Sequence, residues 1–128
     1  MRLLLDTHIA LWALTDDPRL SEQARALIND PANQVMVSAA TVWEIAIKHA
    51  LGRDDMPISG EEALDWFRQA GYDLLPVSPA HAAAVERLPD HHRDPFDRLL
   101  VAQAITEPLR LLSRDPLVVR YGEVVIAV

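Results

Sequence analysis

Short apolar runs alternate along the chain with longer segments in which apolar residues recur at helical spacing. The short runs predict strands at residues 3–5, 34–37, 74–77, 109–112 and 124–128. The longer segments predict helices at residues 7–14, 21–28, 39–51, 61–70, 78–88 and 94–105, with a short turn from 115, and those at 21, 78, 94 and 115 start at Ser or Asp, three of them followed by Pro. Strands that alternate with helices favour parallel pairing. The pattern therefore predicts a three-layer α/β/α sandwich around a central, mainly parallel sheet.

Length and composition narrow the class of protein. The 128 residues suit one domain spanning 1–128, and 50% hydrophobic with 24% charged residues is a globular rather than a disordered composition. No apolar run approaches the roughly 18 residues of a membrane span, and the first residues lack the pattern of a signal peptide. The absence of cysteine excludes disulfides and thiolate metal sites. The simplest expectation is a cytoplasmic protein that does not enter a membrane.

The formal net charge of −7 changes the range of partners. This negative charge argues against a protein that binds nucleic acid through a broad basic surface. It counts less against a nuclease that uses metal ions, because such an enzyme concentrates carboxylates and its bound cations reverse the local field.

Acidic residues stand at the places where a parallel sheet binds ligands. Asp6 and Asp115 follow predicted strands, and ligands of open parallel sheets bind outside the carboxyl ends of the strands. Glu44 and Asp97 lie on apolar helices. Each acid also has an ordinary structural explanation, because Asp6 and Asp115 could cap helices, Asp97 could favour the first turn of one, and Glu44 could pair with Lys48. For each acid taken alone, both explanations stay open.

The four acids are more informative as a set. Carboxylates that converge at one edge of a sheet repel one another unless cations hold them. Oxygen ligands with water suit Mg²⁺ or Mn²⁺, and two such ions about 3.5–4 Å apart can activate water for phosphodiester hydrolysis. The sequence therefore predicts a magnesium or manganese site.

Other catalytic patterns are absent or weak. The sequence has no cysteine nucleophile, no G-x-S-x-G and no glycine-rich phosphate loop. The histidines lack zinc spacing, and the adjacent His91 and His92 are not expected to share one metal ion. Trp12, Trp43 and Trp66 are expected in the core or at an interface.

Four segments resemble the PIN-domain toxins of the VapC type. They are LLLDTH at residues 3–8 with Trp12, SAATVWEIAIK at 38–48, HRDPFDRLLVAQA at 92–104 and LLSRD at 111–115. The segments span almost the whole chain in the family's order, and the third is the most specific. In two places the chain departs from the family pattern, since Ser113 stands where threonine is common and Asp115 is followed by proline.

The resemblance implies a PIN-like fold and an RNA endonuclease that is the toxin of a type II toxin–antitoxin pair. It implies that Mg²⁺ or Mn²⁺ is held by the residues Asp6, Glu44, Asp97 and Asp115. Hydroxyls that would orient these carboxylates, and residues beside the site or near the substrate, are Thr7, Ser38, Ser113, Asp94 and Arg98. Of these, Asp94 is expected to cap the helix that carries Asp97, and Arg98 and Lys48 to be cations available to RNA.

Partners and rival functions follow from the same residues. An RNA substrate, a cognate antitoxin and a second copy of the chain are the expected partners. A receiver-like signalling domain fits poorly, because Thr7 rather than a second acid follows Asp6. A phosphohydrolase with acids at i and i+2 fits poorly as well, because His8 takes the second place. A PIN domain that only binds is disfavoured by the intact set of acids.

Overall fold

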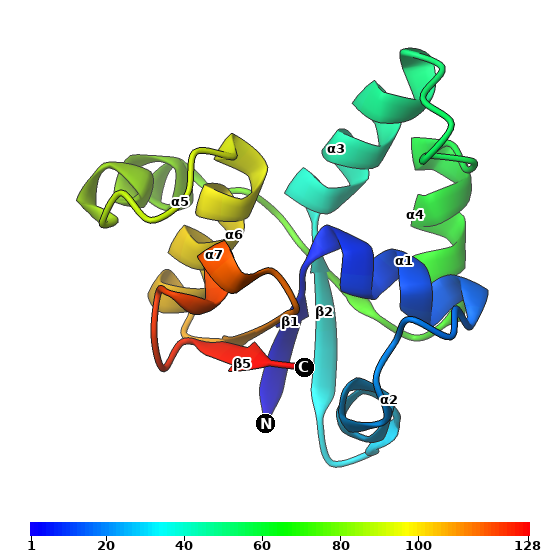
Figure 1. Cartoon of the computed structure of the whole chain (residues 1–128), viewed down its shortest axis with the longest axis horizontal. Coiled ribbons are helices and arrows are strands. Elements are labelled where there is room, and N and C mark those ends of the chain that lie inside the picture. The colour runs from blue at the N-terminus through cyan, green and yellow to red at the C-terminus, as the bar shows by residue number, and fades with distance from the viewer.

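The computed structural model describes residues 1–128 and contains one sheet of five parallel strands in the order β3-β2-β1-β4-β5 (Figure 1). The strands are β1 (Arg2–Leu5), β2 (Gln34–Ser38), β3 (Asp73–Leu75), β4 (Arg110–Ser113) and β5 (Val125–Ala127). The helices are α1 (Thr7–Thr15), α2 (Glu22–Asn29), α3 (Ala39–Ala50), α4 (Gly60–Gln69), α5 (Pro79–Ala84), the 3-10 helix η1 (Val85–Arg87), α6 (Pro95–Thr106) and α7 (Pro116–Val119). The predicted α/β/α architecture is confirmed.

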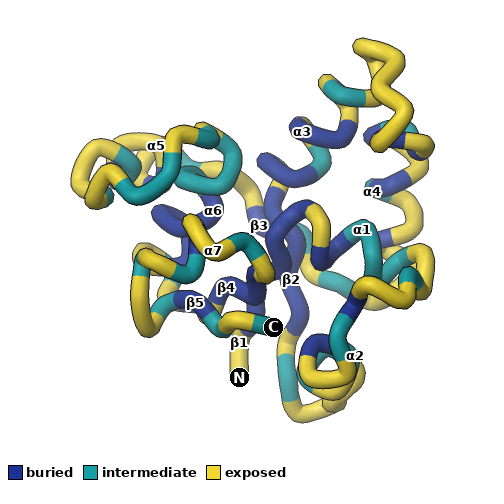
Figure 2. Tube along the Cα trace, in the orientation of Figure 1, coloured by how far each residue is buried: buried dark blue, intermediate teal, exposed yellow.

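The sheet is buried on both faces, which explains why its strands are continuous apolar runs. Successive side chains of a strand point to opposite faces. In β1, Leu3 and Leu5 join the core beneath α1, α2, α3 and α4, whereas Leu4 joins the core beneath α6 and α7. Figure 2 shows this buried centre, with exposed residues concentrated on the outer helices and loops.

The structure corrects some details of the prediction. The predicted strand at 74–77 ends at Leu75, because Pro76 has no N–H to continue the ladder. The predicted helix 78–88 is α-helical only to Ala84 and then tightens into η1. The longest helices have 12 residues, and none could carry an apolar segment across a membrane.

Candidate metal centre

The strand order creates one preferred place for a site. The chain leaves the central strand β1 for β2 and β3 on one side, and it later forms β4 and β5 on the other side. The carboxyl end of β1 therefore lies at the switch point, where an open parallel sheet leaves a crevice. Helices α1, α3 and α7 start at this edge, and α6 begins beside it (Figure 1).

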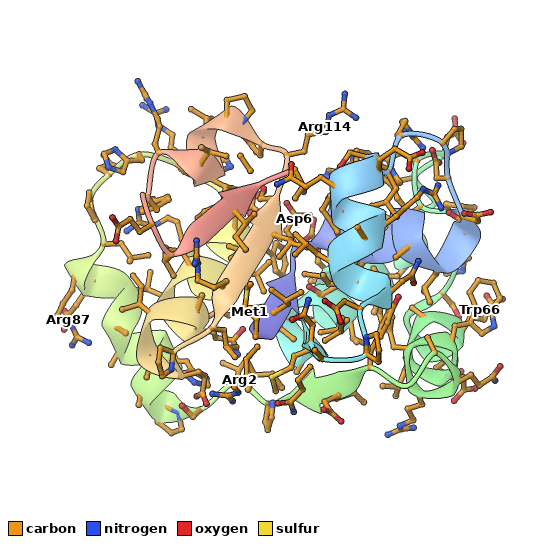
Figure 3. The ribbon with its side chains drawn as sticks, turned by 90° about the horizontal axis from the view of Figure 1, so that it is seen from below. Met1, Arg2, Asp6, Trp66, Arg87 and Arg114 are labelled. Atoms are coloured by element: carbon orange, nitrogen blue, oxygen red, sulfur yellow. The ribbon has the colours of Figure 1, made fainter.

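Asp6 directly follows β1 and caps α1. Its Oδ1 accepts a hydrogen bond from the backbone N–H of Ile9 at 2.9 Å, so the capping role is confirmed. The residue is only 5% exposed and lies in the interior of the molecule (Figure 3). Burial raises the pKa of Asp6, and hydrogen bonds from Ser113 and Ile9 only partly oppose this shift. Burial therefore favours a state in which the charge of Asp6 is neutralised by a proton or by a cation.

Glu44 lies on the buried side of α3 and has a partner for each carboxylate oxygen. Thr7 Oγ1 donates to Oε1 at 2.7 Å, and Thr41 Oγ1 lies 3.3 Å from the Thr7 hydroxyl. The ammonium of Lys48 lies 2.5 Å from Oε2, one helical turn along α3. The expected Glu44–Lys48 pair therefore exists, and it neutralises a carboxylate that is only 4% exposed.

Asp97 lies in the first turn of α6, one turn from the residue that caps this helix. The cap is Asp94, whose Oδ1 accepts from the N–H groups of Phe96 at 2.8 Å and Asp97 at 3.0 Å. The pKa of Asp97 is raised to about 7, first by burial and then by the negative charges of Asp94, Asp6 and Glu44. The structure thus brings the carboxylates of Asp6, Glu44 and Asp94 close enough to raise the pKa of Asp97.

His92 joins the acids, a role that the sequence analysis did not assign to it. Its Nε2 lies 2.9 Å from Asp97 Oδ2 and 3.2 Å from Asp115 Oδ2. Its Nδ1 accepts from the N–H of Asp94 at 3.3 Å, so the proton of a neutral ring is on Nε2 and points at the carboxylates. Ligand atoms of His92, Asp97 and Asp115 all lie within 4.8 Å of one another.

Asp115 is the most open of these acids, with a side chain that is 38% exposed. Its Oδ1 accepts from Leu117 N–H at 2.8 Å and thereby caps α7. The Ser113 hydroxyl accepts from the N–H of Asp115 at 3.1 Å and fixes the turn after β4. Because Oδ1 serves the cap, Oδ2 is the oxygen that Asp115 turns to the site.

Two further predicted residues support the site from a distance. Ser38 is fully buried, and its hydroxyl caps α3 by accepting from Ala40 N–H at 3.0 Å. Arg98 donates to three backbone carbonyls and to the Tyr121 hydroxyl, and one of these carbonyls belongs to His92. The guanidinium therefore holds the loop that carries His92.

The donor set fits a small divalent cation. It consists of carboxylate oxygens, and such ligands suit Mg²⁺ or Mn²⁺. The raised pKa values of Asp6 and Asp97 show that these acids repel one another or lack solvation when no cation balances them. The N-termini of α1, α3, α6 and α7 add partial positive charge at the same edge. The acids can therefore gather here, and a cation would relieve their remaining repulsion.

Comparison with known proteins gives the family. The family model of the PIN domain matches residues 3–124. Ribonuclease VapC22 of Mycobacterium tuberculosis is 32% identical over 116 residues, which cover 88% of this chain and 86% of the relative. Ribonuclease VapC16 of the same organism is 39% identical over 71 residues, covering 52% of this chain and 50% of the relative.

A solved structure supports the same fold. The crystal structure of VapBC2 from Rickettsia felis bound to a DNA fragment from their promoter aligns with a TM-score of 0.71 and 16% identity. The alignment covers 100% of this chain and 98% of that one. With a family model that spans almost the whole sequence and a relative that is similar over most of it, the chain belongs to the PIN-domain family and is of the VapC type.

Proposed function

We propose that this protein is a divalent-metal-dependent endoribonuclease and the toxin of a toxin–antitoxin pair. The observation that carries the proposal is the convergence of Asp6, Glu44, Asp97 and Asp115 at the switch point of the sheet, where the pKa of Asp97 is raised to about 7. Acids with such perturbed pKa values in a crevice are typical of functional sites. The ribonuclease names of the two relatives add support for RNA as the substrate.

Asp6, Glu44, Asp97 and Asp115 would hold Mg²⁺ or Mn²⁺, with His92 as a further ligand or as a hydrogen-bond donor to the acids. The bound ion would make a water molecule a better nucleophile and stabilise negative charge on the phosphodiester.

The protein's own residues keep these acids in place. Thr7 and Lys48 each bind one oxygen of Glu44, which fixes the carboxylate plane and leaves its two remaining lone-pair directions for other partners. His92 holds Asp97 and Asp115 together through Nε2. The helix caps at Asp6 and Asp115 each use only one carboxylate oxygen, so the second oxygen can serve the site.

The test is RNA cleavage with and without the metal. A panel of single-stranded RNAs is incubated with the protein in Mg²⁺ or Mn²⁺, with and without EDTA. We expect cleavage that EDTA abolishes and that Asp6→Asn removes. The asparagine keeps an oxygen for the Ile9 cap, so the circular-dichroism spectrum should not change. Cleavage that is equally fast in EDTA would contradict the metal mechanism.

An antitoxin and a second copy of the chain are the proposed protein partners. The solved structure with the same fold is a VapBC2 assembly on promoter DNA, which supports a partner of that kind here. The exposed apolar side chains of Trp43, Ile47 and Leu51 recur every four residues on α3 and form one stripe. We propose that this stripe packs against a second copy. A small neighbouring reading frame that encodes a DNA-binding protein would support the antitoxin part.

A further inference from the structure

A pocket of about 410 Å³ opens beside the carboxylates, between α1 and the segment that joins α3 to α4. We call it the Trp12 pocket. Helix α1 contributes His8 and Trp12, and the joining segment contributes Met56 and Ile58 among others. Thr7 and Lys48, the two residues that bind the oxygens of Glu44, also line it. The pocket therefore adjoins the proposed catalytic site through these two residues but does not include the acids themselves.

Flat and cationic groups gather around Trp12. The guanidinium carbons of Arg19 and Arg114 lie 5.1 and 5.7 Å from the centre of the indole ring, and the His8 ring lies 5.8 Å from it. Arg114 also donates to the backbone carbonyl of Arg19 at 3.2 Å. Because Arg114 directly precedes Asp115, this arrangement connects the pocket to the acids; Figure 3 shows Arg114 reaching outward from the molecule while Asp6 lies inside.

These groups match the chemistry of an unpaired nucleotide. Unstacked bases of single-stranded RNA stack on aromatic rings and on guanidinium planes, and arginine and lysine neutralise phosphates. The side chain of Arg19 is 65% exposed, so a base can reach its guanidinium plane. A volume of a few hundred Å³ is typical of sites for small ligands.

The acidic side chains of the pocket are largely neutralised. Asp17 pairs with Arg19 at 2.7 Å, and Asp55 pairs with Arg53 at 3.0 Å. Asp54 remains as an acceptor that could bind an amino group of a base. Arg19 and Lys48 are each paired with an acid, so Arg114, whose guanidinium also lies beside Trp12, is the cation that can meet a phosphate of an RNA strand.

We propose that the Trp12 pocket is a subsite for one unpaired nucleobase of the RNA strand, next to the phosphodiester that is cleaved. This proposal rests on the proposed function and adds to it that single-stranded RNA is selected by base stacking at α1. The pocket adjoins the acids, and two guanidiniums lie beside the indole ring. Both observations favour RNA over a protein segment as the occupant.

The experiment reads Trp12 directly by fluorescence. The chain has three tryptophans, so Trp43→Phe with Trp66→Phe leaves only Trp12, and Trp12→Phe with Trp43→Phe leaves only Trp66 as the matched control. Trp66 lies on α4 at one end of the molecule (Figure 3) and does not line the pocket. Both proteins also carry Asp97→Asn to prevent turnover, and gels verify that the RNA stays intact. The retained Trp12 keeps its native packing, so the readout does not depend on a destabilising change.

Three short RNAs are titrated in Mn²⁺ while anisotropy of a dye on the RNA reports binding. They are a single strand, the same strand with one abasic position moved along it, and the matching duplex. We expect the single strand to quench Trp12 by about twofold and Trp66 hardly at all. One abasic position should remove the quenching and weaken binding by roughly fivefold or more, and the duplex should not quench.

The outcomes separate the two proposals. RNA that binds by anisotropy without quenching Trp12 would overturn the subsite while cleavage by the unaltered protein could still establish the nuclease. Quenching by the protein of the neighbouring reading frame, but not by RNA, would assign the pocket to protein binding and would also overturn it. RNA that neither binds nor is cleaved would overturn both.

Discussion

Single acidic residues at the proposed site also stabilise the fold. Asp6, Asp94 and Asp115 each cap a helix with Oδ1, whereas Asp97 caps nothing. A substitution by alanine therefore removes a cap and a charge together, but asparagine removes the charge and keeps the cap. Asparagine variants are for this reason the correct probes of the site.

Asp94 offers a clean test of this distinction. Asp94→Ala should lower the free energy of unfolding by about 1 kcal/mol, because two N–H groups at the start of α6 lose their acceptor. Asp94→Asn should change it little. Urea unfolding of both variants provides the measurement. Equal destabilisation by alanine and asparagine would mean that the charge of Asp94, rather than its cap, stabilises the protein.

The raised pKa of Asp97 predicts how the metal-free protein responds to pH. Its pKa is about 7 in the folded chain and near 3.8 in the unfolded chain, so the folded state binds the proton more tightly. Stability contributed by this proton is present below about pH 4 and is lost as the pH rises to 7. In EDTA, the melting temperature of the wild type should therefore fall as the pH rises from about 4 to 7. The fall should be smaller for Asp97→Asn.

At pH 8 the same variant should be more stable than the wild type by at least about 1 kcal/mol. Added Mn²⁺ should raise the melting temperature of the wild type more than that of Asp97→Asn, because ligand binding stabilises the folded state. If the melting temperatures of the two proteins changed equally between pH 4 and 8, the folded state would not bind the proton of Asp97 more tightly, which would contradict this prediction.

At the scale of elements, caps and apolar runs made the helices and strands predictable. Ser21, Ser38 and Asp94 start helices where the sequence predicted them. The position of His92 was not predictable, because its ring is placed by a loop whose carbonyl groups at Pro89 and His92 accept hydrogen bonds from Arg98. The hydroxyl of Thr41 in the Glu44 network was missed for a similar reason, since the contact joins α3 to α1.

The tryptophans show the same limit. Trp43 and Trp66 are 59% and 38% exposed, so neither lies in the core, and the interface part of the prediction stays a prediction. The apolar character of a side chain predicts that it is buried. It does not tell whether the side chain packs into the protein's own core or against a partner. Trp12 is half-buried and packs against the core beneath α1.

The close packing of α3 and α4 predicts a strong effect at Gly60, the first residue of α4. A Cβ atom there would lie 2.8 Å from the Cβ and 3.2 Å from the Cα of Ala46, so the helices would have to move apart. Gly60→Ala should cost about 1–3 kcal/mol in urea unfolding. The neighbouring exposed Glu61→Ala serves as the control and should stay within about 0.5 kcal/mol. A neutral Gly60→Ala would show that α4 can shift freely on α3.

At the scale of the whole molecule, the apolar stripe on α3 predicts self-association. Trp43 and Ile47 of α3 and its C-cap residue Leu51 are exposed along one side of the helix, whereas Glu44 is buried. We expect a dimer in light scattering at micromolar concentration and a monomer for Ile47→Glu, because a buried unpaired charge is costly. Ile105→Glu, on the exposed side of α6, is the control and should remain dimeric. A monomeric wild type would refute this assembly.

The central claim is that the carboxylates at the end of β1 hold the divalent cation that RNA cleavage requires. The most direct measurement is the initial rate of single-stranded RNA cleavage as a function of Mn²⁺ concentration for the wild type, Asp97→Asn and Asp94→Asn. The two variants each remove one negative charge, three residues apart, from the start of α6. We predict saturable, Mn²⁺-dependent cleavage by the wild type and by Asp94→Asn, and a collapse of the rate for Asp97→Asn at every concentration. An active Asp97→Asn beside an inactive Asp94→Asn, or a wild-type rate independent of Mn²⁺, would contradict the account.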